Sequence, residues 1–182
     1  MQATPQSRWH TQHYISSKWH NWLAVRPHVA DCGLLLDIGG GHGWEALHLQ
    51  QEQHTRVWIL ERFDTQGRTG GSGEASTFAG YHTRAQLRAR HREIGLDAEL
   101  VDADRPHMDA HLRFDVIWSF ASCGFHYPVS THLALMRRHS HERTRWILNI
   151  RHRLEREHRQ YLRLDHLVRE MSGSRTWICS PL

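Results

Sequence analysis

Short apolar runs alternate along the chain with longer, mixed stretches. Apolar residues gather densely enough for buried strands at residues 34–38, 57–60, 98–101, 114–119 and 145–150. Between these runs, apolar residues recur at helical spacing. Helices are therefore expected from Trp44 onward, over residues 81–95 and over residues 129–139. This order of strand and helix predicts βαβ units, and hence an α/β fold with a mostly parallel sheet.

The N-terminal segment, residues 1–30, is expected to form a helical lid on this core. Ser16 or Ser17 is suited to cap a helix there, and Pro27 should end it. The whole chain of 182 residues fits one domain. We therefore predict a single domain spanning residues 1–182, in which residues 31–182 form the α/β core.

Two further stretches complete the predicted fold. Residues 62–80 are rich in glycine and are expected to form a long loop that closes over a site. Residues 153–171 are basic, with apolar residues at helical spacing, and predict a long helix. Residues 176–179 are expected to add a sixth strand at the edge of the sheet. This prediction leaves only one strand after residue 150, so the sheet is expected to be shortened at its C-terminal end, without a final hairpin.

A glycine-rich turn carries the clearest chemical signal. Residues 37–43 have the sequence Asp-Ile-Gly-Gly-Gly-His-Gly, between a predicted buried strand and a helix. Without Cβ atoms the backbone can turn sharply, and a ligand can lie against it. The N-terminus of the following helix adds free N–H groups. The residues predicted to bind a cofactor here are Asp37, Gly39, Gly40, Gly41 and Gly43.

The spacing of these glycines separates two cofactor classes. The Gly-x-Gly-x-x-Gly pattern of dinucleotide-binding folds would need a glycine where Trp44 stands. The pattern present, acid-x-Gly-x-Gly-x-Gly, resembles the first motif of class I S-adenosylmethionine (SAM)-dependent methyltransferases. The resemblance covers residues 34–150. It implies a Rossmann-like, doubly wound sheet with helices on both faces, SAM as cofactor, S-adenosylhomocysteine as product, and contacts from Asp37 and the glycines to the methionine part.

Acids follow the next two predicted strands as well. Glu61 ends the second strand about 20 residues after the glycine turn, where an acid that binds a ribose diol is expected. NAD enzymes share this acid, so Glu61 indicates a ribose site and not one particular cofactor. The resemblance further implies an acid that contacts the adenine amino group after the third strand. Asp102 and Asp104 are both candidates, and a helix-capping role for Asp104 is the alternative.

The segment after the fourth predicted strand is expected to border the reacting groups, because ligands sit at the carboxyl ends of strands in open α/β sheets. Ser119 and Phe120 are predicted cofactor contacts, with core packing as the alternative for Phe120. A hydroxyl acceptor needs a base, and His126 is the candidate, since neutral imidazole suits proton transfer near pH 7. Tyr127 is the candidate for orienting the acceptor. The alternative is that His126 and Tyr127 only pack the loop.

Composition narrows the expected partners. The formal charge is +4, Lys18 is the only lysine, and there are 18 histidines. The arginine bias suits phosphate or carboxylate recognition, although genomic base composition is the favoured explanation. No carboxylate stands at residues 119–122 and no regular Cys/His spacing occurs, so no metal site is predicted. No apolar run approaches the ~20 residues that span a bilayer, so no membrane contact and a cytoplasmic location are expected.

Three hypotheses for function remain open. The first is methyl transfer from SAM to a small-molecule or sugar/glycan acceptor, at a hydroxyl group. Residues 15–20, Ile-Ser-Ser-Lys-Trp-His, resemble a segment that precedes the fold in some sugar and macrolide O-methyltransferases. The second is methylation of RNA or another polymer, to which the arginines would bind. The third is a SAM-binding protein without methyl transfer.

Overall fold

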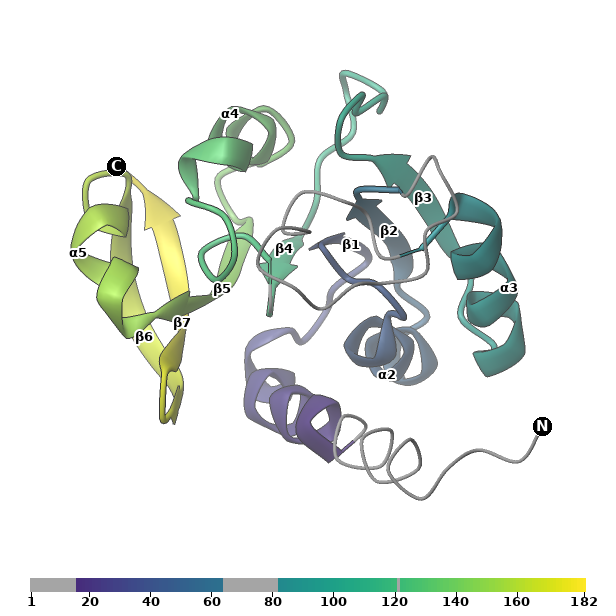
Figure 1. Ribbon diagram of the computed structural model, residues 1–182, viewed down its shortest axis with the longest axis horizontal. Coiled ribbons are helices and arrows are strands. Elements are labelled where there is room, and N and C mark those ends of the chain that lie inside the picture. The colour runs from purple at the N-terminus through teal and green to yellow at the C-terminus, as the bar shows by residue number, and fades with distance from the viewer. Residues whose placement is uncertain (1–15, 64–81, 121) are drawn as a thin grey trace.

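The computed structural model describes residues 16–63, 82–120 and 122–182. These residues form a seven-stranded sheet with the order β3-β2-β1-β4-β5-β7-β6 (Figure 1). The parallel strands are β1 (Leu34–Ile38), β2 (Arg56–Glu61), β3 (Ala98–Asp102), β4 (Val116–Ser119) and β5 (Arg145–Arg151). The predicted α/β fold with a mostly parallel sheet is confirmed.

The central strand β1 shows why the sequence folds this way. All five of its residues are buried. Parallel partners flank it on both sides, with Asp37 aligned to Ile59 of β2 and to Trp118 of β4. A strand covered on both faces has no solvent side, so an apolar run replaces the alternation of polar and apolar residues. Only Asp37 interrupts the apolar run of β1, at the end where the glycine turn begins.

Helices cover both faces of the sheet, as predicted. The described residues 16–25 are helical and lie on one face together with α2 (Trp44–Gln53) and α3 (Arg84–Ile94). The helix α4 (Ser130–Arg138) packs on the opposite face (Figure 1). Each face has its own buried apolar cluster. None of the helices in the described part of the chain has both the length and the hydropathy to span a bilayer.

The N-terminal helix ends close to the predicted position. Residues 16–25 pass into a short 3-10 helix, η1 (Arg26–His28), which has Pro27 in its first turn. The predicted lid and long loop fall largely outside the described residues, which omit 1–15 and 64–81. Their roles stay predictions.

The prediction for the C-terminal region is wrong. Residues 153–171 do not form one long helix: only the short η3 (His152–Leu154) and α5 (Glu155–His158) are helical, and β6 (Leu162–Met171) follows. The strand β7 (Ser174–Pro181) is not at the edge, because it lies between β5 and β6 and is antiparallel to both. The sheet is therefore not shortened. It ends in a complete hairpin (Figure 1).

The irregular pairing of β6 explains the error. Its register with β7 shifts between Leu164 and His166 and again between Leu167 and Arg169. Each such irregularity offsets the two-residue alternation that identifies a strand. The apolar residues of β6 then fall three and four positions apart, which is the spacing of a helix.

Candidate functional site at the carboxyl edge of the sheet

The carboxyl ends of four neighbouring parallel strands bring predicted residues together along one edge of the sheet. Gly39 is fixed to the second strand, because its N–H donates to the carbonyl of Leu60 at 2.8 Å. Glu61 and Asp102 are aligned with each other across β2 and β3. The acids and hydroxyl found at or near these strand ends are Asp37, Glu61, Asp102 and Ser119.

The turn between β1 and α2 needs its glycines for two different reasons. Gly39, Gly41 and Gly43 have φ angles of +70°, +53° and +70°, a conformation that favours glycine. A Cβ at Gly39 would lie 2.2 Å from the Cβ of Ser122, and one at Gly43 would lie 2.4 Å from Leu96 Cδ2. No atom of the described residues lies within 4 Å of the corresponding position at Gly41. Packing therefore excludes a side chain at Gly39 and at Gly43. At Gly41 the backbone is open on the side where a Cβ would point.

Asp37 is a buried acid beneath this turn. Only 2% of it is exposed, and a Cβ at Gly40 would come within 2.5 Å of its carboxyl group. Burial raises the pKa of Asp37 to about 7, and the carboxylate of Glu45 acts in the same direction, while Lys18 opposes them. A positively charged ligand group beside Asp37 would stabilise its ionised form.

Glu61 is joined directly to the glycine turn. Its Oε2 accepts the N–H of Gly41 at 3.0 Å, and its Oε1 accepts the N–H of Arg62 at 3.0 Å. Burial raises the pKa of Glu61, and these two hydrogen bonds oppose that shift. A carboxylate offers about four lone-pair sites, so both oxygens can still accept from ligand hydroxyls. Glu61 is therefore held beside the open backbone of Gly41.

The two candidate adenine-contacting acids have different partners. Arg62 donates to Asp104 from Nε at 2.9 Å and from Nη2 at 2.7 Å, while Asp102 Oδ1 accepts the N–H of Asp104 at 3.0 Å. Tyr127 and Asp102 are close enough to Arg62 to help raise its pKa, after the larger effect of Asp104. Both acids and Tyr127 thus lie around Arg62, the residue that follows Glu61. A contact with adenine stays a prediction for either acid.

Ser119 and Phe120 are inside the protein. The hydroxyl of Ser119 donates to the carbonyl of Ile38 at 2.8 Å and accepts the N–H of Cys123 at 2.9 Å, and the residue is fully buried. Phe120 is 7% exposed, with its ring centroid 5.2 Å from that of Trp118. Both residues hold the end of β4 in place. Their contact with a cofactor remains a prediction.

The loop at residues 122–127 presents His126 to solvent. The carbonyl of Ser122 accepts N–H groups from Phe125, His126 and Tyr127 at 3.1, 2.7 and 3.1 Å, which closes a tight turn. The His126 side chain is exposed and rests against the ring of Phe125. Partial desolvation and the charge of Arg151 lower the pKa of His126. Its imidazole is therefore mostly neutral at pH 7, which is the form a general base needs.

Sequence reasoning missed three residues beside the glycine turn. Lys18 Nζ lies 3.0 Å from Glu45 Oε1, and Asn21 Nδ2 donates to the same oxygen at 3.1 Å. Glu45 is buried at the second position of α2, directly after the turn. Two features of the sequence could have indicated these residues: Lys18 is the only lysine, and Glu45 is an acid in the first turn of α2.

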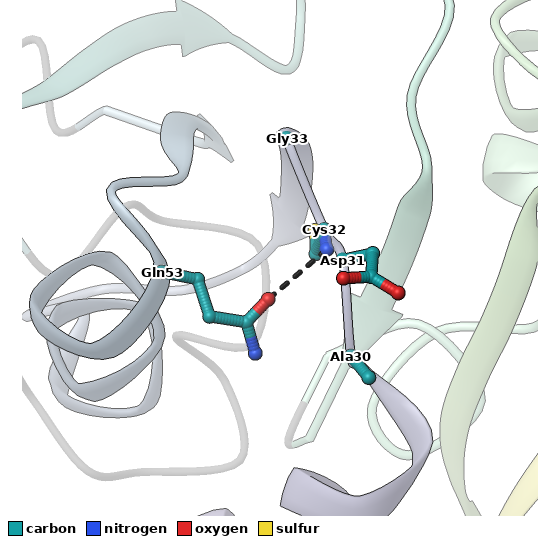
Figure 2. A pocket seen from close by; sticks show the side chains of 5 residues that line it. All are labelled: Ala30, Asp31, Cys32, Gly33 and Gln53. Carbon is teal, nitrogen blue, oxygen red and sulfur yellow. Dashed lines mark hydrogen bonds between the residues drawn. The ribbon is translucent and has the colours of Figure 1, made fainter.

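A hollow elsewhere on the molecule is distinct from this site (Figure 2). Its lining residues are Ala30, Asp31, Cys32, Gly33 and Gln53. They surround the amino end of β1, whereas the glycine turn follows its carboxyl end. The N–H of Cys32 donates to Gln53 Oε1 at 3.0 Å across it. Within the described residues, no group of three or more His, Cys, Asp or Glu side chains is arranged to hold a metal ion.

Comparison with known proteins shows the fold. No protein-family model and no curated protein matches the sequence. A ribosomal protein L11 methylase from Lactobacillus delbrueckii subsp. bulgaricus is similar in structure, with a TM-score of 0.58 and 15% identity over 87% of this chain and 75% of that one. The PH0226 protein from Pyrococcus horikoshii OT3 has a TM-score of 0.59 and 11% identity over 90% of this chain and 91% of that one.

A third structure is TrmK from M. capricolum, in complex with S-adenosyl-homocysteine. It has a TM-score of 0.50 and 12% identity over 87% of this chain and 66% of that one. At these identities the likeness concerns the arrangement of strands and helices. The chain has the Rossmann-like fold of class I SAM-dependent methyltransferases.

Proposed function

We propose that this protein binds SAM at the glycine turn and transfers its methyl group to a hydroxyl of a small-molecule or sugar acceptor. The observation that carries the proposal is the hydrogen bond from the Gly41 N–H to Glu61, next to open backbone at Gly41 and above the buried Asp37. In this arrangement Asp37 would bind an ammonium group and Glu61 would bind a ribose. The part of the ligand between these two groups would lie against the backbone of Gly41. A methylase and a SAH complex among the structural neighbours support it.

The residues at the edge of the sheet fit the parts of this cofactor. Asp37, whose ionised form needs a positive partner, would bind the ammonium of the amino-acid end. Glu61 would accept hydrogen bonds from the ribose hydroxyls, and Asp102 or Asp104 would accept from the adenine amino group. When bound, SAM supplies a methyl group activated by the positive charge on sulfur.

The acceptor side would use the loop after β4. His126 would take the proton from the acceptor hydroxyl while the oxygen attacks the methyl carbon, and Tyr127 would orient the acceptor. The three hydrogen bonds to the Ser122 carbonyl hold this loop in one conformation. Holding the reactants in line is itself worth several kcal/mol of the barrier, so a rigid loop contributes before any proton moves.

Two measurements test this proposal. Calorimetric titration with S-adenosylhomocysteine should show binding by the wild-type protein and strong loss in Asp37→Asn. Incubation of a cell extract with methyl-labelled SAM should then place label in the small-molecule or glycan fraction, and His126→Ala should remove it. Absence of binding would refute the cofactor assignment. Label in RNA or protein would refute the acceptor class, and binding with no label in any fraction would refute methyl transfer.

A further inference from the structure

A buried ion pair joins the N-terminal helical residues to α2 beside the glycine turn. The side chains of Lys18 and Glu45 are 13% and 2% exposed, with Nζ and Oε1 3.0 Å apart. Asn21 donates to the same Glu45 oxygen, and its own amide oxygen accepts from Arg169 of β6 at 2.6 Å. A buried ion pair adds little net stability, because desolvation offsets the attraction. Its position beside a ligand-binding turn therefore suggests another role.

Among the described residues, the charges acting on Asp37 are those of Glu45, Glu61 and Lys18. Asp37 and Glu45 are both 2% exposed, and among the described residues the charge of Lys18 acts on Asp37 in opposition to Glu45 and to burial. His42, in the turn itself, does not supply a second cation. Burial and neighbouring positive charges lower its pKa to about 4, so it is neutral at pH 7. Glu45 and the ionised form of Asp37 both interact with Lys18, and a ligand ammonium would add a positive charge beside them.

The position of Lys18 also matches the second charge of an amino acid. An α-ammonium and its carboxylate share one carbon, so a ligand ammonium beside Asp37 brings the carboxylate close to the same place. The contact with Glu45, the second residue of α2 after Gly43, holds Lys18 next to the turn, and its charge contributes to the pKa shifts of Asp37 and His42. A lysine ammonium has three donors, enough to contact Glu45 and a ligand carboxylate together.

We propose that Lys18 binds the carboxylate of the cofactor's amino-acid end, and that it makes the site select nucleosides with such an end over nucleosides without one. Glu45 and Asn21 are positioning residues: they hold the helix that carries Lys18 against the turn. The proposal rests on the proposed function, because it assigns Lys18 to one part of SAM.

The test compares two ligands. S-adenosylhomocysteine carries the amino-acid end, and 5′-methylthioadenosine lacks it. The variant is the double substitution Lys18→Met/Glu45→Gln, which removes both charges and leaves no unpaired carboxylate in the interior. The matched control is Arg26→Met/Glu52→Gln, because this pair also joins the N-terminal segment to α2, at 2.8 Å, but is exposed.

Calorimetry should show that the double variant binds S-adenosylhomocysteine roughly 10- to 100-fold more weakly, the effect of a lost charge-assisted hydrogen bond. Its affinity for 5′-methylthioadenosine should stay within twofold of wild type, and the control should change neither. Equal loss for both ligands, or no loss for either, overturns the proposal. If the double variant does not fold by circular dichroism, Lys18→Gln provides the same comparison. A wild-type protein that binds neither ligand overturns the proposed function itself.

Discussion

The glycine turn and the loop at residues 122–127 face the same edge of the sheet, yet they are built in opposite ways. In the turn, the groups expected to meet a ligand are open backbone at Gly41 and the buried acid Asp37, fixed by neighbouring strands. In the loop, hydrogen bonds to Ser122 fix the backbone, while the reactive candidate His126 extends into solvent.

The difference indicates which of the two regions is more constrained by packing. The turn is specified by steric limits and buried charge, so few substitutions are compatible with it. An exposed histidine on a loop can be exchanged at little cost in stability. If the proposed function holds, the acceptor side is therefore less constrained by the fold than the cofactor side.

Removing His126 should have the largest effect, and only on turnover. His126→Ala should lower kcat by about 10²- to 10⁴-fold, the usual contribution of a general base, with S-adenosylhomocysteine affinity unchanged. The measurement is label transfer to the acceptor fraction, with calorimetry alongside it. A variant that keeps wild-type turnover would assign His126 to packing the loop.

Asp37→Asn should separate binding from stability at the turn. Affinity for S-adenosylhomocysteine should fall by about 100-fold, because the ammonium loses a buried charged partner. The free energy of unfolding should behave differently. The raised pKa of Asp37 means that the folded state binds the extra proton, so its contribution to stability is lost as pH rises from about 4 to about 7. At pH 8 the variant should thus melt at or above the wild-type temperature. A clear drop in both S-adenosylhomocysteine affinity and melting temperature at pH 8 would contradict this account.

The free energies of unfolding of Gly39→Ala and Gly41→Ala should differ, because only Gly39 is closely packed. Gly39→Ala should cost roughly 3 kcal/mol of unfolding free energy, from left-handed strain plus overpacking against Ser122. Gly41→Ala meets no neighbour among residues 16–63, 82–120 and 122–182 and should cost only about 1 kcal/mol, from strain alone. Urea denaturation measures both, and equal costs would show that the turn is not packed as described.

The smallest expected effect is on pH dependence. Because the pKa of Asp37 is about 7, S-adenosylhomocysteine should bind roughly tenfold more weakly at pH 6 than at pH 8, where Asp37 is ionised. The charges acting on this acid are Glu45, Glu61 and Lys18. Asp37→Asn should bind with no such dependence. A wild-type affinity that is flat over this range would place the ammonium elsewhere.

The central strand, the glycine turn and the acid after the second strand could be predicted from the sequence because their signals are local. The apolar run before Asp37 indicated a central strand, the glycines indicated the turn, and the acid at Glu61 needed only the length of one βαβ unit. The contact between Lys18 and Glu45 could not be predicted from the sequence. The two residues are 27 positions apart on different helices, and only the tertiary fold brings Nζ and Oε1 to 3.0 Å from each other. No spacing rule connects them.

The C-terminal hairpin was misread for a physical reason. β6 lies at the edge of the sheet, so only part of its length is buried, and its two register shifts break the alternation. In such a strand the apolar spacing no longer distinguishes strand from helix. The ion pair of Arg62 with Asp104 was likewise unpredictable, because it depends on which neighbour the fold supplies.

A crystal structure with S-adenosylhomocysteine tests the central claim most directly. The account predicts the amino-acid end beside Asp37, the ligand chain against the backbone of Gly41, and the ribose hydroxyls within hydrogen-bonding distance of Glu61. Ligand bound in another groove, with Glu61 still contacted only by the N–H groups of Gly41 and Arg62, would contradict it.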